Sequence, residues 1–133
     1  MPRLIRVSSR ALGERQWVRV YVYDDLSEMR EAATRFSVGG GSFDDAAGVT
    51  HLYVNADGTA VLPVIRLHRG HLGTEVISHE MVHAASAIYG ATLGQHARAR
   101  AHFTHYCEPF AYLYGELLAR LVRALHEHGY YAD

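Results

Sequence analysis

The sequence predicts an α+β fold: a small mixed or antiparallel sheet whose edge strand packs on one helix, with a second long helix near the C-terminus. Short segments rich in β-branched and aromatic residues come first along the chain, and two long stretches with helical spacing of apolar residues follow them. Strands gathered before helices are typical of this class. The length of 133 residues predicts a single domain over residues 1–133.

The N-terminal part predicts two strands and a helix. Arg3–Ser8 and Trp17–Tyr23 alternate or run apolar, as strands do. Asp24 and Asp25 follow and supply an N-cap for a helix that we expect to extend to about Phe36. The glycine triplet after this helix indicates a loop.

A hairpin is predicted next. Val49–Val54 and Thr59–Leu67 flank the turn sequence N-A-D-G, in which Gly58 suits a position of positive φ. Pro63 has no N–H to donate to a neighbouring strand. We therefore expect the second strand of the hairpin to lie at a sheet edge or to carry a bulge.

Two long helices complete the prediction. Thr74 is the expected N-cap of the first, and Gly90 its C′ residue. The second is expected to start between Cys107 and Pro109, because proline is tolerated in a first turn, and to end near His128. Its predicted apolar stripe comprises Phe110, Leu113, Leu117, Leu118, Leu121, Val122 and Leu125.

Composition and charge exclude several classes of function. The net charge is −1, and although all 13 basic residues are arginine, no stretch is a run of arginines, so nucleic acid is not an expected partner. The arginines near the N-terminus form either a modest basic patch or a solvated strand face. The single cysteine, Cys107, excludes an intramolecular disulfide. The first residues lack the apolar core of a signal peptide, and no apolar run approaches about 18 residues, so we expect a cytoplasmic protein without a membrane partner.

The segment T-E-V-I-S-H-E-M-V-H, which begins at Thr74, carries the strongest functional signal. On an α-helix His79 and His83 lie one turn apart on the same face, so their imidazole nitrogens can converge on one metal ion. Glu80 points beside them and is suited to accept a proton from a water molecule on the metal. The opposite face of the helix is apolar and predicts a core stripe of Ile77, Met81, Ala84, Ala85 and Ile88.

A catalytic zinc ion needs a third protein ligand. The extended pattern H-E-x-x-H-x-x-G-x-x-H is excluded, because Ser86 and Tyr89 stand where it requires glycine and histidine. The candidates further along the chain are His96, His102, His105, Glu108 and Glu116. Glu108 is favoured, because a second helix antiparallel to the first could bring its first turn against the two histidines. His105 and His102 remain the alternatives.

These residues carry a family resemblance. H-E-M-V-H followed 25 residues later by the glutamate of E-P-F-A-Y resembles the gluzincin clan of zinc metallopeptidases, and in particular small phage and bacterial members that keep only the minimal catalytic core. The resemblance covers about Thr59 to Leu118. It implies a zincin-like core, a Zn²⁺ cofactor held by His79, His83 and Glu108, and a peptide or protein substrate that pairs with Val61–Leu67. Pro109, directly after Glu108, departs from the family pattern.

The mechanism that this resemblance implies is hydrolysis of a peptide bond by a zinc-bound water molecule that Glu80 activates. An oxyanion stabiliser is also required. The sequence offers Tyr106, Tyr112, His102 and His105 for that role. Tyr112 ranks first, because it lies one turn after Glu108 on the same face; a structural tyrosine between the two helices is the alternative interpretation.

Two functions follow from the motif. The first is a zinc metallopeptidase with Glu80 as general base. The second is a non-catalytic metal-binding module, regulatory or interacting, with a zincin-like fold. The presence of Glu80 favours the enzyme, because a purely structural site does not need a glutamate beside its ligands. The sequence does not indicate the oligomeric state.

Overall fold

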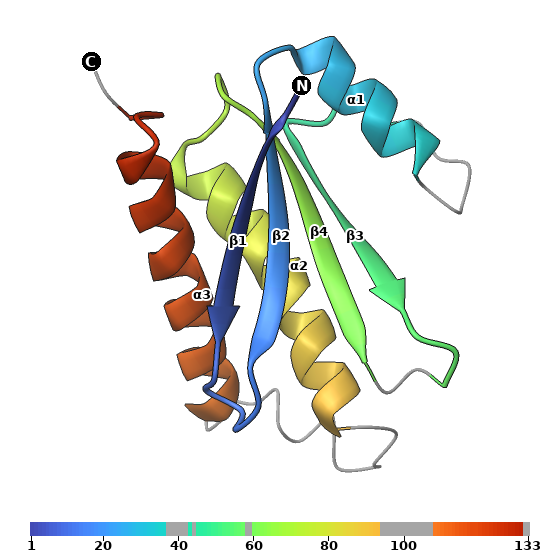
Figure 1. Cartoon of the computed structure of the whole chain (residues 1–133), viewed down its shortest axis with the longest axis vertical. Helices are drawn as coiled ribbons and strands as arrows, with labels where there is room; N and C mark the ends of the chain where they lie inside the picture. The colour runs from blue at the N-terminus through green and yellow to red at the C-terminus, as the bar shows by residue number, and fades with distance from the viewer. Residues whose placement is uncertain (37–42, 44, 58–59, 94–107, 132–133) are drawn as a thin grey trace.

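The computed structural model describes residues 1–36, 43, 45–57, 60–93 and 108–131. These residues form a four-stranded sheet and three helices (Figure 1). In chain order the elements are β1 (Arg3–Ser9), β2 (Gln16–Tyr23), α1 (Leu26–Arg35), β3 (Gly48–Val54), β4 (Val61–His68), α2 (Thr74–Leu93) and α3 (Glu108–Glu127). The strand order is β1-β2-β4-β3, with β2 parallel to β4 and the other neighbours antiparallel. The predicted α+β class with a mixed sheet is confirmed.

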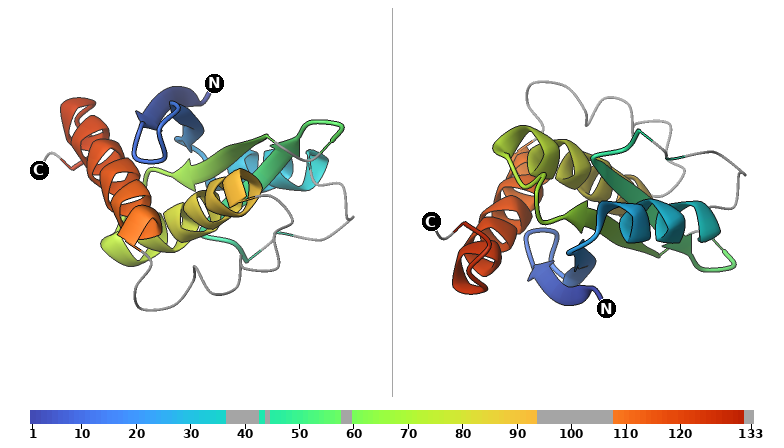
Figure 2. Two further views of the ribbon diagram at one scale, coloured as in Figure 1. Left: turned by 90° about the horizontal axis from the view of Figure 1, so that it is seen from below. Right: turned by 90° about the horizontal axis from the view of Figure 1, so that it is seen from above.

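The helices cover the two faces of the sheet unequally. α2 lies across one face, and α3 runs antiparallel beside it and packs against β1 (Figures 1 and 2). The main core lies between these helices and the sheet, and it includes the fully buried Val18, Val20, Ile65, Leu67, Met81, Leu113, Leu117, Leu121 and Leu125. α1 packs on the other face, where Met29 and Ala32 form a small cluster with Tyr23. α1 is the only helix of the described residues that packs on this second face.

The start of α1 is where the sequence predicts it. Asp25 is the N-cap, and its Oδ1 accepts a hydrogen bond of 2.8 Å from the backbone N–H of Ser27. This contact satisfies one of the N–H groups that a helix start leaves unpaired. The helix ends at Arg35, one residue before the predicted boundary at Phe36.

The prediction that the strand containing Pro63 lies at the sheet edge is wrong. β4 is an interior strand that pairs with β2 on one side and β3 on the other. Pro63 is tolerated because pairing with β2 begins only at Val64, so no residue of β2 is opposite the proline. The edge strand next to α2 is β3. The predicted turn glycine, Gly58, lies outside the described residues.

The predicted end of the motif helix is also wrong. α2 continues through Gly90 to Leu93, and Gly90 does not have the positive φ of a C′ glycine. Ala91 and Thr92 after it are compatible with helix, and the Thr92 hydroxyl donates to the carbonyl of Ile88 at 2.9 Å. The apolar stripe of α2 is confirmed, since Ile77, Met81, Ala84, Ala85 and Ile88 are all buried.

The last helix has the predicted boundaries within a residue. α3 starts at Glu108 with Pro109 in its first turn, and four leucines at four-residue spacing bury the face toward α2 and the sheet. Among the residues that the structure describes, no helix combines the length and apolar character needed to cross a bilayer.

Candidate metal centre

His79 and His83 converge in the way that the spacing predicts. Their Nε2 atoms are 3.2 Å apart, and the two rings are nearly perpendicular, at 78°. Two nitrogens that each lie about 2.0–2.1 Å from a tetrahedral zinc ion are about 3.3 Å apart. The side chain of His79 is 66% exposed and His83 is also exposed, so both imidazoles are accessible from outside the core. This pair therefore has the separation that two ligands of one metal ion require.

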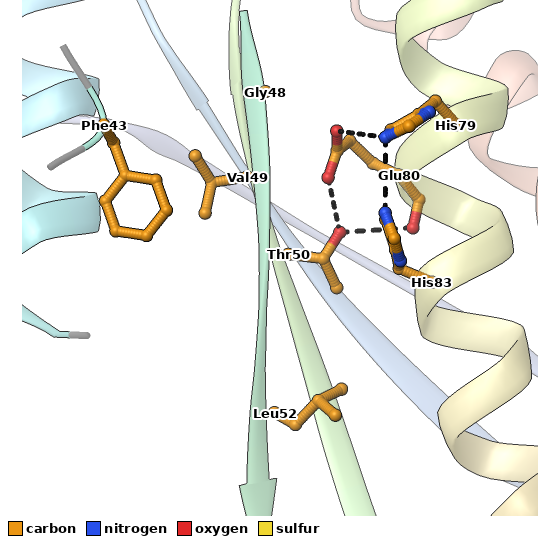
Figure 3. A pocket seen from close by; sticks show the side chains of 8 residues that line it. All are labelled: Phe43, Gly48, Val49, Thr50, Leu52, His79, Glu80 and His83. Atoms are coloured by element: carbon orange, nitrogen blue, oxygen red, sulfur yellow. Dashed lines mark hydrogen bonds and ion pairs between the residues drawn. The ribbon is translucent and has the colours of Figure 1, made fainter. Parts of the chain in front are cut away.

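Glu80 is buried beside the two histidines, with only 6% of its surface exposed. Its Oε2 lies 4.0 Å from Nε2 of His79, and its Oε1 accepts a hydrogen bond of 2.8 Å from the hydroxyl of Thr50 (Figure 3). One carboxylate oxygen is thus held by the edge strand, and the other faces the histidines. This arrangement leaves Oε2 available to accept a proton in the space next to the imidazoles.

Strand β3 approaches α2 closely at this point because Gly48 has no side chain. A Cβ atom on Gly48 would lie 3.1 Å from Cγ of Glu80 and 3.1 Å from Cγ1 of Val76, which is tighter than an ordinary contact. Thr50, two residues along, points to the same side of the strand and reaches Glu80. Neither residue was predicted from the sequence to belong to the site. Because side chains alternate along β3, the sequence predicts that Thr50 points to the face opposite Val49 and His51. Only the tertiary structure shows that this face meets Glu80.

A pocket of about 340 Å³ opens between β3 and α2 at these side chains (Figure 3). Its described lining consists of Phe43, Gly48, Val49, Thr50, Leu52, His79, Glu80 and His83. The pocket therefore joins the histidine face of the helix to the edge strand, where an extended chain could lie.

The structure does not bring Glu108 to the two histidines. Glu108 is exposed at the first residue of α3, and the neighbouring Phe110 packs its ring on Tyr89, near the C-terminal end of α2. His79 lies in the second turn of α2, toward the opposite end of the helix pair (Figure 1). Within the described part of the chain, no three His, Cys, Asp or Glu side chains are close enough together to hold a metal.

The other predicted residues are also separated from the histidine pair or lie outside the description. Tyr112 is 68% exposed and does not line the pocket, so the alternative of a buried tyrosine between the helices is wrong. Tyr114 is the α3 tyrosine that approaches the motif, with its hydroxyl 3.5 Å from the carbonyl of Ser78. Glu116 forms an ion pair with Arg120 at 2.7 Å. The candidates His96, His102, His105 and Tyr106, together with Cys107, lie outside the described residues.

Comparison of the chain with protein-family models, with curated proteins and with solved structures gave no match. The function is therefore inferred from the geometry of the site.

Proposed function

We propose that this chain is a zinc-dependent metallopeptidase. The observation that supports the proposal best is one constellation: the Nε2 atoms of His79 and His83 lie 3.2 Å apart, and the buried carboxylate of Glu80 is beside them. A general base must be within reach of the proton that it accepts, and the hydrogen bond from Thr50 fixes the position of the Glu80 carboxylate. With one cysteine and no intramolecular disulfide, the chain also suits a reducing compartment, and we propose the cytoplasm.

Each of these residues has a distinct role in the proposed reaction. His79 and His83 would hold the metal through their Nε2 atoms. A bound Zn²⁺ supplies a Lewis acid and lowers the pKa of a water molecule that it coordinates to about 7. Glu80 accepts the proton of the attacking water at Oε2 and returns it to the leaving amine, while the Thr50 hydroxyl keeps Oε1 turned away. Tyr112 stays a proposal for the oxyanion stabiliser, although it does not line the pocket.

The substrate platform is reassigned from β4 to β3. The main-chain groups of β4 are used by strands on both sides, whereas β3 pairs with only one strand among the residues that the structure describes. Peptides bind to sheets by pairing with such an edge. We therefore propose that a peptide or protein substrate lies along Gly48–Val54, beside the pocket that contains Glu80.

The third metal ligand is tested by substitution. Glu108 is the first proposal, with His105 and His102 as alternatives. A large loss of zinc affinity in Glu108→Ala would require the first turn of α3 to move toward the histidines when metal binds. Loss in His105→Ala or His102→Ala, with Glu108→Ala unchanged, would assign the ligand to that histidine and overturn the Glu108 proposal.

The decisive experiment compares wild type with Glu80→Gln in zinc analysis and in cleavage of casein. We expect one zinc per chain in both proteins and a fall in cleavage of roughly 10²–10⁴-fold in the variant, because the amide cannot accept the proton. His126→Ala removes an exposed histidine of α3 and serves as a matched control that should change neither quantity. If wild type and Glu80→Gln bind zinc but are equally inert, the enzyme proposal fails.

A second function stays open because only two metal ligands converge within the described residues. A non-catalytic metal-binding module, regulatory or interacting, would also use His79 and His83. If the chain is such a module, it should bind metal without cleaving casein. It should also associate with another protein in a zinc-dependent way, and Glu80→Gln should not weaken this association.

A further inference from the structure

The face of the sheet opposite α2 gathers arginine and aromatic side chains. Arg6 of β1 and Arg19 of β2 are directly opposite each other, and Tyr21 of β2 is opposite Arg66 of β4. Because side chains of one strand alternate between faces, all four project to the same side. Like charges directly opposite each other repel, so the pairing of Arg6 with Arg19 is unfavourable unless an anion neutralises it.

This face contains a pocket of about 480 Å³. Its described lining residues are Pro2, Arg19, Tyr21, Tyr23, Phe36, Tyr53, Leu62, Val64 and Arg66. They include two arginines and four aromatic rings, and no acidic side chain. An adjoining pocket shares Arg19 and Leu62 and adds Arg6 and Trp17, so the basic and aromatic surface is continuous between the two.

Arg66 is the unusual member of this lining. It is only 5% exposed, and its Nε is buried without a hydrogen-bond partner. Its guanidinium donates to the hydroxyl of Tyr23 at 2.6 Å and lies over the rings of Tyr21 and Phe36, at 5.2 Å and 4.9 Å from their centroids. None of the described acidic residues forms an ion pair with it within 4.0 Å. Burial lowers the pKa of the nearby His51 from its ordinary value, and the positive charge of Arg66 lowers it further.

A buried guanidinium without an acidic partner is costly to the fold, and arginine binds phosphate and carboxylate groups with two parallel hydrogen bonds. We propose that this pocket binds a ligand in which an oxyanion, phosphate or carboxylate, is attached to a planar ring. Arg66 and Arg19 contact the oxyanion, and the ring stacks on the half-exposed Phe36 and Tyr53. The pocket is on the opposite face of the sheet from His79 and Glu80, so this proposal does not depend on the metallopeptidase proposal.

Titration of the full chain with small probes tests the proposal. We expect phenyl phosphate and benzoate to bind at least tenfold more tightly than inorganic phosphate and than phenol, which lack the ring and the charge respectively. Whichever of the two binds better identifies the oxyanion. A short peptide that carries phosphotyrosine shows whether the ligand is a free molecule or a side chain of a partner: similar affinity for peptide and phenyl phosphate favours the free molecule, and tighter binding of the peptide favours the partner.

Three variants assign the binding to this face. Arg66→Met should abolish binding of phenyl phosphate, and in buffer without the ligand it should melt no lower than wild type, because it removes a buried charge that none of the described acidic residues neutralises. Arg19→Gln, an exposed position, should weaken binding at least fivefold and decides the question if Arg66→Met does not fold. Arg123→Gln, an exposed arginine of α3, is the control and should bind as wild type does.

Three results would overturn the proposal. The first is that neither phenyl phosphate nor benzoate binds more tightly than inorganic phosphate. The second is that Arg19→Gln and Arg123→Gln bind equally well. The third is that a single-stranded oligonucleotide binds through Arg19 and Arg66 while the small ring anions do not, which would make this a nucleic-acid surface instead.

Discussion

The hydroxyl of Thr50 is the only side-chain donor that the structure gives to the carboxylate of Glu80 among the described residues. The same hydroxyl also lies 3.2 Å from the backbone carbonyl of Glu80. A buried carboxylate that loses such a donor keeps the cost of leaving water without the compensating bond. The edge strand therefore does more than line the pocket, because it also fixes which carboxylate oxygen faces the histidines.

Replacing Thr50 with valine tests this role. Thr50→Val keeps the shape of the side chain and removes the donor, so we expect it to lower the free energy of unfolding by about 1–3 kcal/mol. Cleavage should fall as well, because Glu80 is then free to rotate. Thr50→Ser keeps the hydroxyl and should retain most of both quantities. Urea unfolding and the casein assay measure them, and equal behaviour of the valine and serine variants would show that the hydrogen bond is unimportant.

A second residue of β3, His51, gives the protein a predictable response to acid. Burial and then the charge of Arg66 lower the pKa of His51 below its ordinary value of 6.5. The unfolded chain therefore takes up a proton at this residue at a higher pH than the folded chain does. Well above pH 6.5, His51 is neutral in both states and its titration does not change the free energy of unfolding. As the pH falls from 6.5 toward the lowered pKa, protonation of His51 in the unfolded chain lowers the free energy of unfolding.

The variant His51→Gln should remove this part of the pH dependence. We expect the free energy of unfolding of wild type to fall more steeply than that of His51→Gln as the pH is lowered from 7 through 6. Chemical denaturation at a series of pH values measures both slopes. Parallel curves for the two proteins would mean that His51 does not titrate differently in the folded and unfolded states.

At the scale of a single element, α2 and α3 each contain a glycine that the helix does not require. Gly90 and Gly115 lie inside the helices without positive φ, and a Cβ atom on either would meet nothing within 4 Å. Glycine in a helix costs about 0.5–1 kcal/mol relative to alanine, mainly because it is more flexible in the unfolded chain. Gly90→Ala and Gly115→Ala should therefore each raise the free energy of unfolding by about that amount in urea unfolding.

Gly129 gives the matched control for these two substitutions. Its φ is +80°, a conformation that alanine adopts only with strain. Gly129→Ala should therefore lower the stability while the other two raise it. If Gly90→Ala lowered the stability as Gly129→Ala does, the assignment of Gly90 to a helix interior would be contradicted.

Elements whose signals are local could be predicted from the sequence. The cap of α1 needs only Asp25 and the N–H groups that follow it, and the leucine stripe of α3 needs only the period of the helix. The position of β4 could not be predicted, because it depends on pairing with β2 across a connection that contains α1 and β3. Pro63 lacks an N–H group and so cannot donate a hydrogen bond at one position of β4. The prediction wrongly inferred from this single position that the whole strand lies at the edge of the sheet.

The same division applies to the candidate site. The convergence of His79 and His83 follows from four-residue spacing on one helix, so the motif alone predicts it. The contribution of Thr50 depends on how closely β3 approaches α2, which Gly48 permits and no local pattern reveals. Whether a residue of α3 can act as the third ligand depends on the offset between the two antiparallel helices. The sequence predicts that the helices pair, but not that Glu108 begins its helix beside the far end of α2.

At the scale of the whole molecule, the two faces of the sheet differ in how the described helices cover them. α2 and α3 bury the first face through Ile65, Leu67 and the leucines of α3, so the histidine helix is fixed by a close-packed core. The other face carries Arg6, Arg19 and Arg66, and among the described helices only α1 packs on part of it. The two proposed sites are therefore separated by the sheet, and ligands of one need not compete with ligands of the other.

Because the core already fixes His79 and His83 at metal-binding separation, zinc should bind the folded chain far better than the unfolded one, in which the pair is not held. Such binding stabilises the fold by about 2.7 kcal/mol when free zinc is at 100 times its dissociation constant. We expect this increase in urea unfolding of wild type and Glu80→Gln, its loss in His79→Ala and His83→Ala, and its reversal by a chelator. His126→Ala should behave as wild type. An equal increase in His79→Ala would place the metal elsewhere in the molecule and would remove the basis of the proposed zinc chemistry at α2.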